Sequence, residues 1–127
     1  GLLAAEYVGQ PVAFEAVHGI LHDDKNVNIE AVTISQNCFL DGVSLKDAGL
    51  NQYKARLIGI VSDNPVHAKR RNRYKLHNQH FYFNPESSFI LHPGDILVLI
   101  GRQLSIDHLQ DLIETSRLRR KSLWTMN

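Results

Sequence analysis

The chain has 127 residues, enough for one domain of ordinary size with part of a second. Apolar residues make up 43% and charged residues 21%, which are the proportions of a globular domain and exclude a disordered segment. The net charge of +1 excludes a general attraction to nucleic acid or acidic membranes, so any such attraction depends on local patches. The single cysteine, Cys38, excludes an internal disulfide and fits a reducing compartment. No apolar run approaches the roughly 20 residues that span a bilayer, and we interpret the chain, which begins with glycine, as a segment of a longer protein.

The first 24 residues have a helical pattern. Pro11 suits the first turn of a helix, because backbone N–H groups in that turn make no hydrogen bond within the helix and the N–H that proline lacks is not needed. Apolar residues then recur at three-to-four spacing and form one stripe: Ala13, Phe14, Val17, Ile20 and Leu21. We expect this stripe to pack against sequence outside the chain or against a second copy.

From Val27 onward the pattern changes to short strands, expected at residues 27–34, 55–61, 81–83 and 96–100. Between the first two, Ser44 is a helix cap and Gly49 a helix stop, which predicts one short helix. The segment 92–95 (HPGD) has Pro and Gly where a type II turn requires them.

A closing helix follows the last strand, with Ser105 as its predicted cap and four apolar residues on one face: Ile106, Leu109, Leu112 and Ile113. The expected fold class is therefore α+β. It is a small, mainly antiparallel sheet of about four strands with a short helix and a C-terminal helix, preceded by an N-terminal helical segment.

The motifs of enzymes are missing from this sequence. It has no Gly-rich phosphate loop, nucleophile elbow or Cys-x-x-Cys pair, so we expect a protein without catalytic residues or cofactors. His18 and His22 are one helical turn apart and could share a metal ion, but no third ligand is evident. We interpret them as solvent-facing histidines and expect no metal site.

The most unusual local feature is the segment 69–75 (KRRNRYK), which has five cations. Its residues Lys69, Arg70, Arg71 and Arg73 could contact the phosphate of a nucleotide, a lipid headgroup or a nucleic acid. The alternative is a solvated hairpin loop. No pattern of stacking aromatics or of a recognition helix supports nucleic-acid binding, so we expect none.

Four segments together resemble the TrkA C-terminal family, also called RCK-C, which is the second half of the regulator of potassium conductance module. They are 43–47 (VSLKD), 55–61 (ARLIGIV), 83–85 (FNP) and 92–101 (HPGDILVLIG). Residues 42–45 match the G-x-x-L of this family, and residues 91–101 match its l-x-x-G-D-x-L-x-x-x-G. The resemblance covers about residues 27–114.

This resemblance implies a division of the chain into three parts. Residues 1–25 would be the last helical part of a preceding RCK-N domain, residues 26–115 the RCK-C domain, and residues 116–127 a basic tail. The protein would be a cytoplasmic regulatory domain at the cell membrane, which senses a small effector, forms a homodimer and controls the gating of a potassium channel or transporter. Its partners would be the second copy, which it meets through its lobes and N-terminal helix, and the pore domain of the parent protein.

Some relatives in this family bind cyclic di-AMP, and the resemblance places the corresponding residues. Pro85 matches the family proline, with Asn84 beside it, but Leu50 stands where those relatives have arginine, which argues against cyclic di-AMP. Arg56 is a substitute cation in this interpretation. The alternative function is a module that binds anionic lipid or nucleic acid through residues 69–75.

Overall fold

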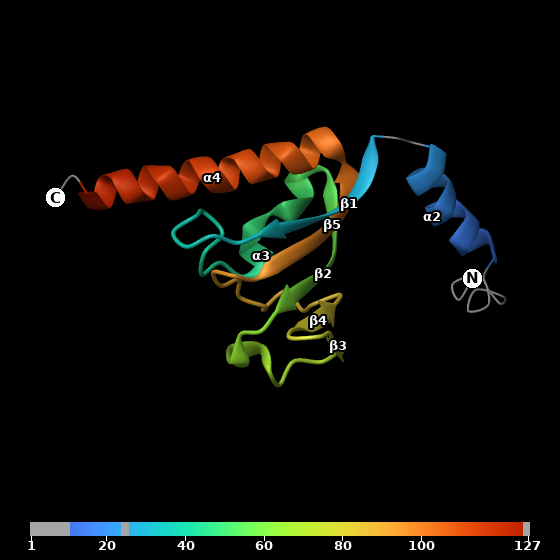
Figure 1. Ribbon diagram of the computed structural model, residues 1–127, viewed down its shortest axis with the longest axis horizontal. Helices are drawn as coiled ribbons and strands as arrows, with labels where there is room; N and C mark the ends of the chain where they lie inside the picture. Colours follow the sequence, from blue (N-terminus) through green and yellow to red (C-terminus); the bar gives the residue numbers. More distant parts are fainter. Residues whose placement is uncertain (1–10, 24–25, 126–127) are drawn as a thin grey trace.

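The computed structural model describes residues 11–23 and 26–125. They form an antiparallel sheet with one long helix packed along it and a second helix standing apart (Figure 1). The elements in chain order are α2 (Pro11–Asp23), β1 (Val27–Thr33), α3 (Leu45–Ala48), the 3₁₀ turn η1 (Leu50–Tyr53), β2 (Ala55–Ser62), the 3₁₀ turn η2 (Pro65–His67), β3 (Arg73–Lys75), β4 (His80–Phe83), β5 (Ile96–Arg102) and α4 (Gln103–Thr125).

The five strands lie in the order β1-β5-β2-β4-β3, and every neighbouring pair is antiparallel. The α+β class is as predicted, but the sheet has one strand more than the four expected. The additional strand is β3, which belongs to the segment 69–75 that we had interpreted as a loop. All three of its residues are exposed, so it shows no alternation of apolar and polar residues that a sequence pattern could reveal.

The hydrophobic core lies between the sheet and α4. The fully buried side chains of the sheet include Ile60 on β2 and Leu97 and Leu99 on β5. The helix contributes Ile106, Leu109 and Ile113, three of the four residues predicted on its inner face. The fourth, Leu112, is half-buried.

The predicted caps of α3 and the predicted turn before β5 are both present in the structure. The Ser44 side chain accepts a hydrogen bond from the Asp47 amide, and Gly49 ends the helix with φ of 61°. In the turn, the Asp95 amide donates to the His92 carbonyl at 3.0 Å, and Gly94 has φ of 91°.

The predicted cap at Ser105 is wrong, because α4 begins at Gln103 directly after β5. The Gln103 backbone amide donates to the Asn26 carbonyl at 2.7 Å, so the first turn uses a partner from the start of β1 instead of a capping side chain. The helix then continues without a break to Thr125, and the cations of the predicted basic tail lie along it.

Helix α2 begins at Pro11, as expected, and lies away from the sheet (Figure 1). Of its apolar side chains, Val12, Val17 and Ile20 are 77%, 52% and 48% exposed. The side chains of Phe14 and Leu21, which complete the predicted stripe with Ala13, lie outside the described residues. The described part of the stripe is thus uncovered in a single copy of the chain.

Two leucines on α4 provide a matched test of this packing. Leu109 is 1% exposed and Leu104 is 84% exposed. We expect Leu109→Ala to lower the free energy of unfolding by about 2–5 kcal/mol, because it removes buried methyl groups and leaves a cavity. Leu104→Ala should change it by less than about 0.5 kcal/mol. Urea unfolding followed by circular dichroism measures both, and equal losses would contradict the described orientation of α4.

Candidate functional site

A pocket of about 240 Å³ opens where the segment 69–75 meets the residues that follow β4. Four of the residues proposed from sequence line it together: Arg70, Arg71, Asn84 and Pro85. The other lining residues are Asn72, Tyr82, Glu86 and Phe89, and we call this set the basic–aromatic pocket. Three residues proposed from sequence do not line it. Arg56 is exposed on β2, Lys69 is exposed on the loop, and the guanidinium of Arg73 donates to the Ala68 carbonyl.

Strand pairing fixes the two asparagines of this pocket. Asn72 and Asn84 both have left-handed backbone conformations, with φ of 57° and 46°. The Asn72 carbonyl accepts from the Phe83 amide at 3.1 Å, which extends the β3–β4 hairpin by one bond. The Asn84 amide donates to the Ile58 carbonyl at 3.1 Å, at the bulge where β2 changes register against β5.

A close approach of β2 to β4 holds the hairpin in place next to this bulge. A Cβ atom on Gly59 would lie 2.5 Å from the Tyr82 carbonyl oxygen and 2.6 Å from the Phe81 ring. Only glycine fits there, so the absence of a side chain at Gly59 allows β4, which carries part of the pocket wall, to lie this close to β2.

The floor of the pocket is aromatic. The rings of Phe89 and Tyr82 meet edge to face with centroids 5.6 Å apart, and both side chains are buried. The Arg70 guanidinium carbon lies 4.7 Å from the Phe89 ring centroid, a cation–π contact. One of its terminal nitrogens donates to the Ser88 carbonyl at 3.4 Å, and its Nε is buried without a hydrogen-bond partner.

This arrangement suits a small anion. Two guanidinium groups and the side-chain amide of Asn84 supply donors for phosphate or carboxylate, and Glu86 partly offsets their charge. The volume is below the roughly 300–1,000 Å³ of pockets that enclose drug-sized ligands. One copy of the chain can therefore enclose a phosphate group or a fragment of a nucleotide, and a larger ligand would extend beyond it.

A buried polar network lies directly behind the aromatic floor. The Asp95 carboxylate accepts from the Ser62 hydroxyl at 2.5 Å, from the His92 amide at 3.0 Å, and faces His67 Nε2 at 3.0 Å. Both Asp95 and His67 are 1% exposed. The His67 ring stacks on Phe89 with a centroid distance of 3.9 Å, so the network supports the floor. No sequence signal pointed to it, because its members are separated by about 30 residues in the chain.

Burial lowers the pKa of His67 below its ordinary value of 6.5, because desolvation penalises the charged imidazolium more than the bond and charge of Asp95 favour it. His67 is therefore neutral at pH 7, with its Nε2–H donated to Asp95. Ser62 also donates to Asp95 and not to the imidazole, so these three side chains do not form a nucleophile with its base.

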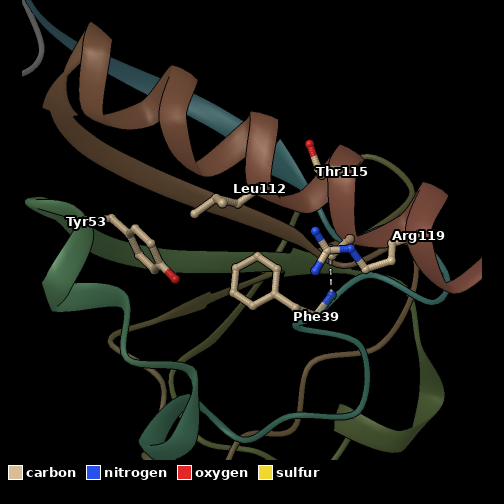
Figure 2. A pocket seen from close by; sticks show the side chains of 6 residues that line it. Phe39, Tyr53, Leu112, Thr115 and Arg119 are labelled. Carbon is tan, nitrogen blue, oxygen red and sulfur yellow. Dashed lines mark hydrogen bonds between the residues drawn. The ribbon is translucent and has the colours of Figure 1, made fainter.

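A second pocket, of about 230 Å³, lies between α4, η1 and the loop after β1. In Figure 2, Phe39, Tyr53 and Leu112 point toward one another and Arg119 reaches over them from α4. The Phe39 amide donates to Ser116 Oγ at 2.9 Å, which ties the loop to the helix. The lining is mainly apolar with one cation, and no sequence motif predicted it.

Comparisons with known proteins were made by sequence and by structure. No protein-family model matches the chain, and no curated protein matches it in sequence. Among solved structures, it is similar to the RCK C domain of the potassium transport protein KtrA, determined in complex with cyclic diadenosine monophosphate. The TM-score is 0.52 at 20% identity, over 77% of this chain and 96% of that one.

A second similar structure is the GsuK RCK domain, with a TM-score of 0.47 and 13% identity. The match covers 82% of this chain and 21% of the GsuK chain. The KtrA match shows that this chain has the fold of an RCK C domain, as the motifs at residues 42–45 and 91–101 predicted. Within residues 11–23 and 26–125, no helix is long and apolar enough to cross a membrane.

The buried network makes stability depend on pH. Below about pH 6.5 the unfolded chain protonates His67 while the folded chain keeps it neutral, so unfolding takes up a proton. We expect the free energy of unfolding to fall as pH drops below 6.5 and until the pH passes the lowered pKa of the folded state, by at most about 1.4 kcal/mol per pH unit for this one group. Urea titrations at several pH values measure this slope. His67→Asn should flatten it and His77→Asn, which removes an exposed histidine, should not; an unchanged slope in His67→Asn would contradict the assignment.

Proposed function

We propose that this chain is a regulatory lobe of a potassium channel or transporter, located at the cytoplasmic face of the membrane. The observation that carries the proposal is the fold, which matches nearly the whole RCK C domain of a potassium transport protein. The lobe binds an effector and changes its arrangement with a partner, and it performs no chemistry. The proposed division stays as predicted, with residues 1–25 the end of an RCK-N domain, 26–115 the RCK-C domain and 116–127 a basic tail.

The effector site in this proposal is the basic–aromatic pocket. Arg71 is exposed at its rim, and Arg70 is held against Phe89 with Nε unused. Donors of this kind favour a phosphate-bearing compound. An effector gates only if it prefers one arrangement of the lobes, and preferences of about 1–3 kcal/mol are typical.

Cyclic di-AMP is not the effector we expect. Leu50, which stands where the resemblance places an arginine, is 9% exposed and packs in the core, so it presents no charge to a ligand. Arg56, which we interpreted from the sequence as a substitute for that arginine, is exposed on β2. Adenine mononucleotides and inorganic phosphate fit the pocket volume better.

The second copy of the chain is the partner that we propose for α2. This helix presents Val12, Val17 and Ile20 to solvent, and burying this face against an identical helix would remove apolar surface from water. The parent protein would add its pore domain as a further partner.

The alternative function, binding of anionic lipid or nucleic acid through residues 69–75, is supported by exposed cations. Lys69, Arg71 and Lys75 are exposed cations on one segment, which could contact anionic lipid or nucleic acid. Arg70 and Arg73, however, contact the Phe89 ring and the Ala68 carbonyl within the chain, so fewer of their donors are free to contact such a surface. Binding to anionic vesicles or oligonucleotides that falls steeply with salt would favour this alternative.

The effector site is tested by thermal melting of the full chain with phosphate, AMP, ADP, ATP and cyclic di-AMP. We expect at least one mononucleotide or phosphate to raise the melting temperature. Arg71→Ala should then weaken its binding about tenfold or more, because a charge-assisted hydrogen bond is lost. Lys69→Ala removes the same charge from a neighbouring position outside the pocket and should leave binding unchanged. Equal losses in both variants, or no response to any compound, would remove the effector role from this pocket.

Dimerisation is tested by sedimentation velocity. We expect the full chain to be a dimer at micromolar concentration and the double variant Val17→Glu, Ile20→Glu to be a monomer, because the added carboxylates cannot be buried in an apolar interface. His22→Glu places a carboxylate on the opposite side of the same helix and should stay dimeric. A dimer that survives the double variant would place the interface elsewhere.

A further inference from the structure

Three side chains that can ligate a metal ion converge behind the basic–aromatic pocket. One ring nitrogen of His67, one of His92 and one carboxylate oxygen of Asp95 all lie within 4.8 Å of one another. His67 comes from η2, while His92 and Asp95 belong to the turn that leads into β5. The site is therefore formed by two segments that are held together by the sheet.

Each imidazole already has one nitrogen oriented by an acceptor. His92 Nδ1 lies 2.9 Å from the Ile90 carbonyl oxygen, so Nδ1–H donates there and Nε2 keeps its lone pair. His67 donates Nε2–H to Asp95, and its Nδ1 is buried without any hydrogen-bond partner. His92 thus has the arrangement usual in histidines that bind metals, in which a carbonyl fixes the tautomer of the ligating ring.

An unpartnered nitrogen on a side chain with 1% exposure is unusual, because burying a polar atom without a hydrogen bond costs about 1–3 kcal/mol. Because Nε2 is the nitrogen that faces Asp95, an ion shared with Asp95 would bind Nε2 and displace its proton, and Nδ1 would stay protonated on the far edge of the ring.

We propose that His67, His92 and Asp95 bind a divalent transition-metal ion of the Zn²⁺ class, with water as the remaining ligand. Two imidazoles and one carboxylate are the donor set that zinc, cobalt and nickel prefer, whereas Mg²⁺ and Ca²⁺ require mainly oxygen ligands. The proposal does not depend on the regulatory function proposed above.

The required movement is small. Metal–ligand distances of about 2.0–2.2 Å place neighbouring ligand atoms about 3.3 Å apart in a tetrahedral site. The ligand atoms, now within 4.8 Å, must therefore close by at most about 1.5 Å. His92 is half-buried while the other two are buried, so its side chain can supply this movement and admit the ion.

Metal binding would act on the floor of the pocket. His67 stacks on Phe89, and the His92 ring meets His67 edge to face at 5.5 Å. An ion would fix η2 against the turn before β5 and hold the His67–Phe89 stack. Because coupling between two sites is reciprocal, any ligand that moves Phe89 would change the affinity for the metal by the same factor that the metal changes the affinity for the ligand.

The test is titration of the EDTA-treated, dialysed full chain with ZnCl₂ by calorimetry and with CoCl₂ by visible absorption. We expect one Zn²⁺ per chain, a visible band from tetrahedral Co²⁺ with nitrogen and oxygen ligands, and a melting temperature that rises with Zn²⁺ but not with equal Mg²⁺ or Ca²⁺. His92→Ala should weaken Zn²⁺ binding about tenfold or more and leave the metal-free melting temperature nearly unchanged, since His92 is half-buried and the Asp95 contact uses its backbone amide. His77→Ala is the control for an exposed histidine outside the cluster.

Three results would overturn the proposal. The first is the absence of saturable Zn²⁺ binding at millimolar concentration. The second is a Zn²⁺ affinity that His92→Ala leaves unchanged. The third is binding abolished by His18→Ala or His22→Ala, whose rings stack at 4.1 Å on α2, because the ion would then belong to that helix.

Discussion

The Asp95 carboxylate is the contact on which the rest of the structure depends. It is 1% exposed and joins β2 through Ser62, η2 through His67 and its own turn through the His92 amide. A buried carboxylate without these donors would cost several kcal/mol, so the three segments are constrained to meet at one point. This constraint fixes where β5 begins, and β5 is the strand that both β1 and β2 need as a partner.

The same network positions the functional surface. Because the His67 ring stacks on Phe89 and the Arg70 guanidinium lies against the same Phe89 ring, a buried polar cluster determines the position of a half-buried cation. The candidate site is therefore built from the core outward, from the buried Phe89 and Tyr82 to the exposed Arg71 and Glu86 at the rim. Such a site can respond to a ligand without any change in the sheet.

Local chemistry made much of this fold predictable from the sequence. Ser44, Gly49 and Pro93-Gly94 each require a particular backbone geometry, and the apolar runs at residues 55–61 and 96–100 mark buried strands. Strand β3 could not be predicted, because it is fully exposed and owes its structure to pairing with β4. The cluster around Asp95 was beyond sequence reasoning because only the folded sheet brings His67 and His92 together. The pairing of Asn84 and Pro85 with Arg70 and Arg71 likewise depends on the β3–β4 hairpin.

The strand order has a consequence for synthesis of the protein on the ribosome. β1 pairs only with β5, in a register that joins Val27 to Arg102, so the chain between them must be complete before either strand is satisfied. Closing such a distant contact costs entropy that only the finished sheet repays, which slows folding. Before residue 102 has left the ribosome, β2, β4 and β3 can already pair with one another, whereas β1 has no partner strand in this sheet. The nascent domain therefore exposes β1, and the edge of β2 that pairs with β5, until β5 is complete, and it is then that chaperones would be needed.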